Sequence, residues 1–319
     1  MVRMIPRRLA LGAITVFLVS TIIFAGVELL PGDACTAFLQ RDAQGKLLDN
    51  CRAELGLNRP AVERYVEWAS GALTGDLSVS AKGRQPISEI VGIRLRNTLL
   101  LASGAAMIGV PLALVFGVWA ALRRDRLTDL TISTLAIGFM TVPEFVSATV
   151  MILVFSIWLN WLSGIIIISP DAPLIEFIPK IVLPVLVLTF VMTAHILRTV
   201  RSSVINTLAS DFVQMAVLKG VPYWQVIIRH VLPNALLPVI NVVALTIAWL
   251  LGGVVVIETV FNYPGLGRLM IDSITDRDLP VTQAIALIIA TIYVGVNLAA
   301  DILAMIVNPR LRTLKARQE

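Results

Sequence analysis

Long runs of apolar residues alternate with shorter polar segments along the whole chain. The runs cover residues 9–30, 98–122, 131–159, 180–200, 235–257 and 281–307. Each holds about 20 residues or more, enough for an α-helix to cross a hydrocarbon core about 30 Å thick. They are continuous, whereas the strands of a membrane barrel are short and alternate in polarity. The pattern therefore predicts an all-α polytopic membrane protein with six transmembrane helices.

The longest polar segment separates the first run from the second. Within it, Val62, Tyr65, Val66 and Trp68 follow helical spacing after the turn-forming sequence Gly-Leu-Asn-Arg-Pro. We therefore expect a small insertion that contains a short amphipathic helix. The chain divides into a first helix with its leading residues (1–30), this loop domain (31–97), a transmembrane core with a polar loop at 201–234 (98–307), and a tail (308–319).

Composition and charge agree with a membrane location. Hydrophobic residues make up 57% of the chain and charged residues only 15%, against about 25% in soluble domains. The net charge of +5 does not indicate a nucleic-acid partner, because the basic residues are sorted by loop. Fourteen Lys and Arg residues lie on one side of the predicted helices, and three lie in the short loops on the other side. By the positive-inside rule, both termini are cytoplasmic and loop 31–97 is external.

The sequence offers few groups for covalent chemistry. Cys35 and Cys51, its two cysteines, both fall in the external loop. In an oxidising compartment we favour a disulfide over a metal pair without a nearby His, or over two free thiols. There is no Gly-x4-Gly-Lys-Ser/Thr phosphate-binding loop and no His-Glu-x-x-His motif. We predict that the chain is not an enzyme and itself holds no cofactor or metal.

The loop 201–234 is punctuated by glycine and proline. Its first half carries one predicted apolar helix face: Ile205, Leu208, Phe212, Met215 and Ala216. Gly220 suits a helix C-cap, Pro222 suits the first turn of a second helix, and Pro233 is expected to end that helix. The second apolar stripe is Tyr223, Val226, Ile227 and Val231. This helix–turn–helix pair fits either a membrane surface or the groove of a partner protein.

The spacing of this loop resembles the cytoplasmic signature of ABC-importer permeases: Glu-Ala-Ala, three residues, Gly, nine residues, Ile-x-Leu-Pro. Here the positions read Gln214-Met215-Ala216, then Gly220, then His230-x-Leu232-Pro233, with every gap kept. The stretch SDFVQMAVLKG resembles the peptide-transporter branch, as do ELLPGD, LGLNRP, TGDLSVS, LRTVRSSVINTL and IETVFNYPGLGRLMIDSITDRDLPVTQA. Over nearly its whole length the chain is similar to the dipeptide/oligopeptide permease family, in the subunit type with a long first external loop.

This resemblance implies a type I ABC importer permease fold in a bacterial inner membrane, working by alternating access. The implied partners are a second homologous permease subunit, two cytosolic ATPase subunits that bind ATP and Mg²⁺, and a periplasmic binding protein that delivers a peptide or related small solute. The loop would be the coupling helix docked on an ATPase, and its family-matching residues are Asp211, Ala216, Lys219, Gly220, Leu232 and Pro233. The alternatives are a non-peptide solute and a secondary transporter, for which we see no inverted repeats.

Charged residues within apolar runs are costly in lipid and are therefore candidates for function. Glu144 follows Pro143 in the third run, where it either faces the pore beside a helix kink or is satisfied by a freed backbone group. Glu258, at the external end of the fifth run, is a gate or binding-protein contact, or is simply exposed. Asp301, near the cytoplasmic end of the sixth run, is expected to pair with another helix.

Overall fold

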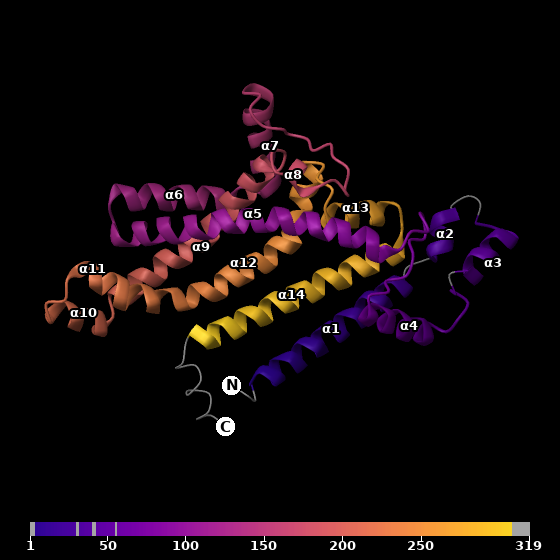
Figure 1. The fold of residues 1–319 in the computed structure, drawn as a ribbon, viewed down its shortest axis with the longest axis horizontal. Coiled ribbons are helices and arrows are strands. Elements are labelled where there is room, and N and C mark those ends of the chain that lie inside the picture. The colour runs from indigo at the N-terminus through magenta and orange to yellow at the C-terminus, as the bar shows by residue number, and fades with distance from the viewer. Residues whose placement is uncertain (1–3, 30–31, 40–42, 55, 308–319) are drawn as a thin grey trace.

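The computed structural model describes residues 4–29, 32–39, 43–54 and 56–307, which form a bundle of long helices (Figure 1). The long helices are α1 (Met4–Glu28), α5 (Ile87–Leu122), α9 (Val182–Leu208), α12 (Leu232–Val260) and α14 (Leu279–Val307). The start of α1 and the end of α14 point toward the end of the bundle that carries α10 (Asp211–Leu218), whereas α13 (Leu266–Thr275) lies at the other end (Figure 1). We refer to these as the α10 end and the α13 end.

α9 is the central helix, and α5, α6 (Leu127–Thr141) and α12 pack around it. Small residues allow α5 to approach it closely. A Cβ at Gly117 would lie 2.7 Å from the Cβ of Val200, so no larger residue fits there without a shift of the helices. About two helical turns further along, Thr193 Oγ1 donates to the carbonyl of Gly109 over 3.2 Å. The core of the molecule therefore lies along α9, where 13 of the 27 residues are buried.

α1 lies at the edge of the bundle and packs chiefly on α14 and on the loop helix α4 (Ala61–Thr74). Gly12 makes the contact with α14 possible, because a Cβ there would already lie 3.2 Å from Val294 Cγ1. An ion pair between Arg8 and Asp301 joins the same two helices, so the interhelical partner expected for Asp301 is present. The outer side of α1 is apolar and exposed, as a helix facing lipid requires.

The third apolar run is not a single helix. α6 ends at Thr141, and α7 (Glu144–Met151) continues into the π-helical η2 (Ile152–Trp158) at an angle of 105° to α6. Pro143 explains the break, because proline has no N–H and holds Val142 in an extended conformation (φ −79°, ψ 127°). The kink expected beside Pro143 is thus a complete break. The described residues contain five membrane-length helices, or six candidate spans if the bent pair counts as one.

α5 begins at Ile87 and is longer than the apolar run that predicts it. Its first turns carry Ile87 and Val91, which are buried in a small separate core with Leu266 of α13 and Ala284 of α14. The apolar run 98–122 predicts a boundary between the loop domain and the core after residue 97. α5 crosses this predicted boundary. Sequence polarity misplaces this boundary because Arg94 and Arg96 interrupt the apolar pattern while the backbone stays helical.

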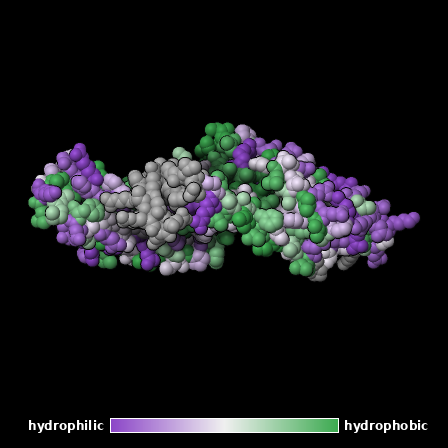
Figure 2. Space-filling model, turned by 90° about the horizontal axis from the view of Figure 1, so that it is seen from below, coloured by the Kyte–Doolittle hydropathy of each residue, from purple (hydrophilic) through white to green (hydrophobic). Residues whose placement is uncertain are grey.

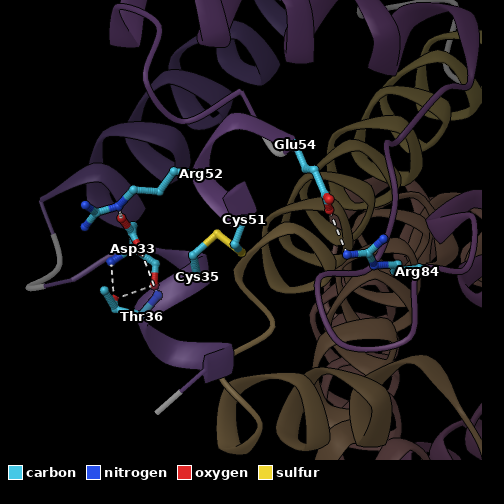
Figure 3. Close-up of a disulfide and its surroundings, with 7 residues drawn as sticks. All are labelled: Asp33, Cys35, Thr36, Cys51, Arg52, Glu54 and Arg84. Atoms are coloured by element: carbon cyan, nitrogen blue, oxygen red, sulfur yellow. Dashed lines mark hydrogen bonds and ion pairs between the residues drawn. A yellow bond between two sulfur atoms is a disulfide. The ribbon is translucent and has the colours of Figure 1, made fainter. Parts of the chain in front are cut away.

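The segment between α1 and α5 forms α2 (Ala34–Leu39), α3 (Gly45–Glu54) and α4. A disulfide between Cys35 and Cys51 joins α2 to α3, with an S–S distance of 2.07 Å (Figure 3). Beside it, Asp33 accepts hydrogen bonds from the Thr36 N–H over 2.7 Å and from Arg52 Nε over 2.6 Å. Burial raises the pKa of Asp33, but the hydrogen bonds from Thr36 and Arg52 outweigh this effect and leave the pKa below its ordinary value.

The loop domain is also tied to the bundle. Arg84 Nη2 donates to Glu54 Oε2 over 2.7 Å, which links α3 to the segment before α5 (Figure 3). Ser80 Oγ donates to Asp278 Oδ2 over 2.5 Å, and Lys82 pairs with Asp276 over 2.7 Å. Because Asp276 and Asp278 lie between α13 and α14, the loop domain is held at the α13 end.

Candidate functional site

The loop between α9 and α12 is helical, but its first helix does not continue α9. α9 ends at Leu208, Ser210 has an extended backbone (ψ 149°), and α10 then starts in a new direction. The single apolar face predicted across this break is therefore wrong. Three residues of this predicted face lie on α10. Ala216 is buried in the main core, whereas Phe212 and Met215 are about half exposed.

Gly220 ends α10 in a Schellman motif, the C-cap role predicted from its position. Its N–H donates to the carbonyl of Val217 over 2.9 Å, and the Val221 N–H donates to the carbonyl of Ala216 over 3.2 Å. Its φ is +76°, a left-handed conformation that costs a residue with a Cβ about 1–2 kcal/mol. No atom lies within 4 Å of a Cβ built there, so the backbone alone requires glycine.

The second helix of the loop runs without interruption into the fifth span. α11 (Tyr223–Gln225), the π-helical η3 (Val226–Val231) and α12 together form one helical stretch. Pro233 lies in the first turn of α12 and does not end a helix, so the stop predicted there is wrong. The wider π turn before it leaves room for the proline ring. Asn234 Nδ2 donates a hydrogen bond to the carbonyl of His230 over 2.7 Å. α11 and α12 therefore share one helical backbone without a break.

An apolar surface covers the side of this loop that faces away from the core. Leu218 is 81% exposed, and Tyr223 and Trp224 are each 59% exposed. We define the outer patch as Phe212, Met215, Val217, Leu218, Tyr223, Trp224 and Ile228. It occupies the tip of the bundle at the left of Figure 1, where Figure 2 shows hydrophobic residues mixed with hydrophilic ones. Such a patch at the tip of a bundle is typical of a protein-docking surface.

The six family-matching residues of the loop do not share one role. Four are exposed beside the outer patch: Asp211, Lys219, Gly220 and Pro233. Ala216 is only 9% exposed and, with the half-buried Leu232, packs against the main core. These two residues therefore hold the loop in place. Sequence reasoning missed Leu218 and Trp224, whose apolar side chains at the break between α10 and α11 were the available signal.

An ion pair that the sequence did not predict anchors the start of the loop. Arg201 near the end of α9 binds Asp129 on α6 in two hydrogen bonds, Nε to Oδ1 over 2.6 Å and Nη2 to Oδ2 over 2.7 Å. The Asp129 side chain is only 5% exposed, and it also accepts from the Asp125 N–H over 3.0 Å and from Ser133 Oγ over 3.2 Å. The pair fixes the C-terminal part of α9 to α6. The loop begins directly after this part of α9.

Glu258 is fully buried, so its predicted role as an exposed residue or a direct binding-protein contact is wrong in this structure. Thr98 Oγ1 donates to Glu258 Oε1 over 2.6 Å, and the Arg268 N–H donates to Glu258 Oε2 over 2.9 Å. Thr98 Oγ1 in turn accepts from the Leu266 N–H over 2.8 Å. Glu258 and Thr98 therefore cap the first turn of α13 from α12 and α5.

The approach of α13 to this carboxylate depends on Gly265. A Cβ there would overlap the carboxylate of Glu258. Tyr263, in the same turn, donates from its hydroxyl to the carbonyl of Asn97 over 2.6 Å, and Asn97 Nδ2 donates to the carbonyl of Pro264 over 2.9 Å. α5, α12 and α13 thus meet in one buried polar cluster at the α13 end.

Glu144 begins α7 directly after the break at Pro143 and is half-buried. The carbonyl of Pro143 accepts from the Val146 and Ser147 N–H groups over 3.0 and 3.1 Å. An acidic side chain in the first turn of a helix interacts favourably with the helix dipole, but in the described part of the chain no backbone group donates a hydrogen bond to this carboxyl. Within the described part of the chain, no group of three or more His, Cys, Asp or Glu residues is arranged to hold a metal ion.

The arrangement of the membrane helices resembles that of ABC importer permeases. The fold matches the MetNI methionine ABC transporter in inward-facing conformations with a TM-score of 0.55 and 17% identity, covering 69% of this chain and 97% of that one. An amino acid ABC transporter crystallised with histidines matches with a TM-score of 0.50 and 18% identity, covering 70% and 94%. At these identities the likenesses establish the fold of the membrane helices.

Residues 113–313 match the family described as binding-protein-dependent transport system inner membrane component, and residues 1–90 match the N-terminal region of such membrane components. The chain therefore belongs to this family. It is the inner-membrane, multi-pass permease of a binding-protein-dependent ABC importer and a transport component, not a catalytic subunit. A system of this kind includes ATPase and binding-protein partners.

Full-length relatives agree with the match. A probable peptide ABC transporter permease of Sinorhizobium fredii, y4tP, is 33% identical over 97% of this chain and 98% of its own length. The glutathione transport system permease GsiC of Escherichia coli K12 is 34% identical over 93% and 95%. A putative peptide permease of Brucella ovis is 33% identical over 98% and 99%.

Proposed function

We propose that this chain imports peptides or related small solutes by alternating access, after a separate binding protein delivers them. The names of its relatives support this solute class, since they include peptide permeases and a glutathione permease. Glutathione is itself a small peptide, so one pore chemistry would serve both. A non-peptide solute of similar size is the alternative, and a panel of solutes assayed against the cognate binding protein decides between them.

The α10 loop would be the part that couples transport to ATP hydrolysis. The observation that carries this role is the outer patch, which presents exposed apolar side chains on α10 and on α11 with η3, the part that is continuous with the fifth span. The sorting of basic residues supports a cytoplasmic location for the α10 end and both termini. A cytosolic protein can then dock on the patch.

The remaining partners follow from the same role. Two cytosolic ATPase subunits would bind ATP and Mg²⁺, because the sequence of this chain contains no phosphate-binding loop. A second homologous permease subunit would complete the pore, and the solute-binding protein would dock at the α13 end. Glu144 is a candidate pore residue in such a dimer, because it lies half-buried at the break in the third span.

The test is a Leu218→Asp variant in the reconstituted complex. A charge on this 81% exposed side chain should leave the permease folded but reduce recovery of the ATPase subunits, stimulated ATP hydrolysis and uptake together. Leu127→Asp is the matched control, since Leu127 is 80% exposed but lies outside the outer patch. Normal recovery and uptake with Leu218→Asp would refute docking at the patch. A protein that transports without any ATPase subunit would instead be a secondary transporter.

A further inference from the structure

α4, in the loop domain, has three distinct faces. One packs on α1 through Tyr65 and Trp68. A second is polar and exposed, with Glu63, Glu67, Ser70 and Thr74. The third is apolar, and no described part of the chain covers it: Val62, Val66 and Leu73 are 75%, 59% and 90% exposed. These three residues recur at four- and seven-residue steps and so form one stripe along the helix.

The contacts of α4 with α1 place it beside the membrane span. The Tyr65 hydroxyl lies 2.9 Å from both Ser20 Oγ and Thr21 Oγ1, and its ring packs against Phe24 with a centroid distance of 5.3 Å. At 1.5 Å per residue, Ser20 lies about 12 Å along the helix from Glu28, where α1 ends. The candidate span Pro6–Glu28 has 23 residues, or about 34 Å, so little of it extends beyond a hydrocarbon core of about 30 Å. Tyr65 therefore reaches α1 at a depth that lies within the bilayer.

We propose that α4 is a membrane-surface helix whose apolar stripe lies among the lipids of the leaflet at the α13 end. The exposed apolar side of α1, which includes Phe17 at 60% and Ile22 at 69% exposure, faces lipid. Because α4 packs on this helix, its stripe lies next to a surface that lipid already covers. Figure 2 views the molecule from below Figure 1, the side on which α1 and α4 lie. Hydrophobic residues cover the middle of this side and give way to hydrophilic ones at the right, over the loop helices.

The polar groups around the stripe fit a helix at the membrane surface. Arg64 pairs with Glu28 over 2.5 Å at the end of α1, and Arg59 pairs with Glu67 over 2.6 Å on the polar side of α4. The aromatic rings lie on the side toward α1, where the amphipathic Tyr and Trp side chains commonly mark the membrane–water interface. A helix with one polar and one apolar face in this position is typical of interfacial insertion. α4 thus anchors the disulfide-bonded loop domain to the bilayer.

Spin-label accessibility tests this placement. In the full chain, assembled in its complex and reconstituted in lipid nanodiscs, a nitroxide is attached to a cysteine at Val66 or Leu73, and at Ser70 as the matched control on the polar face. The native cysteines stay in their disulfide and do not react. The ratio of collisions with lipid-soluble oxygen to collisions with a water-soluble nickel chelate should be several-fold higher at Val66 and Leu73 than at Ser70.

Two results would overturn the proposal. Equal ratios at all three positions would mean that the stripe faces water. Exclusion of both reagents at Val66 and Leu73 would mean that a protein partner covers it. A photoreactive benzophenone side chain at Val66 gives an independent measurement, since it should crosslink to lipid. Crosslinking to another polypeptide instead would reject lipid as the occupant.

Discussion

Side-chain direction divides the residues of the α10 loop into a set that shapes it and a set that a partner can contact. Ala216 packs into the core of the chain, so a charge there would disturb the fold of the loop itself. Leu218, two residues later, is almost fully exposed. Gly220 contributes only a backbone conformation. A substitution at each position therefore tests a different property: folding, docking or the turn.

Gly220→Val should weaken coupling because valine strongly disfavours the left-handed φ of +76°. The expected cost is about 1–2 kcal/mol in the local turn, seen as reduced ATPase recovery and uptake with unchanged membrane insertion. Gly220→Asn is the control, since Asn tolerates this conformation, and it should retain most activity. Equal activity of the two variants would show that the turn does not require a left-handed residue.

Glu258→Ala should loosen α13, because it leaves the Thr98 hydroxyl and the Arg268 N–H without their acceptor. Loss of hydrogen bonds to a buried carboxyl group is expected to destabilise this region by about 2–3 kcal/mol. Hydrogen exchange of the α13 amides measures this, and Glu258→Gln should be milder because its carbonyl oxygen still accepts. Glu63→Ala, on the exposed side of α4, should change nothing. Unchanged protection in Glu258→Ala would refute the capping role.

At the scale of elements, the continuous helix from α11 into α12 determines how the loop can move the bundle. A helix that ended at Pro233 would leave a flexible joint, whereas the observed continuous helix would carry a displacement of the loop into α12 if the loop couples transport as proposed. The opposite side of the loop is held by α9, whose Arg201 binds Asp129 of α6. In the proposed mechanism, the loop would therefore join a helix anchored to α6 to a helix that follows the docked partner.

Asp129→Ala should destabilise the α6–α9 contact by about 2–3 kcal/mol, less than a fully buried pair because the Arg201 side chain is 29% exposed. The thermal midpoint of the purified complex should fall. The double variant Asp129→Ala/Arg201→Ala should recover part of the loss, since no buried charge is then left unpaired. Arg124→Ala, which breaks an exposed pair with Asp125, is the control and should change stability by less than about 1 kcal/mol. Additive losses in the double variant would contradict direct pairing.

At the scale of the whole molecule, the two ends of the bundle differ in construction. The α13 end is closed by the disulfide-bonded loop domain and by the buried cluster around Glu258. The α10 end exposes an apolar patch on short helices. An importer of the proposed kind requires this asymmetry, because a binding protein and an ATPase must dock on opposite sides of the membrane.

The orientation can be tested with an impermeant thiol reagent on intact cells. Arg124→Cys, between α5 and α6 at the α10 end, should be shielded, and Gly83→Cys, before α5 at the α13 end, should be labelled. Both positions are exposed in the structure, so burial does not explain a difference between them. The same reagent added after permeabilisation should label both cysteines. The reverse pattern in intact cells would invert the proposed topology.

The sequence by itself predicted the membrane class, the approximate positions of the long apolar helices, the loop signature and, as the favoured alternative, the pairing of Cys35 with Cys51. These features depend on local composition, on spacing along the chain and on the presence of two cysteines in one loop. Gly220 was also readable, because a C-cap is a property of a few adjacent residues. Pro143 marked a kink, but its extent as a complete break of 105° was visible only in three dimensions.

Only the tertiary structure decided which residues face inward. Exposure was one reading of Glu258 from the sequence, because its donor Thr98 lies 160 residues away and the turn that brings the Arg268 N–H onto the carboxylate is not visible in the sequence. Ala216 and Leu218 lie two residues apart on α10 and so face opposite sides of the helix, and only the packing of α10 against the core decides which side is buried. Asp129 and Arg201 are 72 residues apart. Burial and pairing are properties of packed helices, and periodicity within one segment does not contain them.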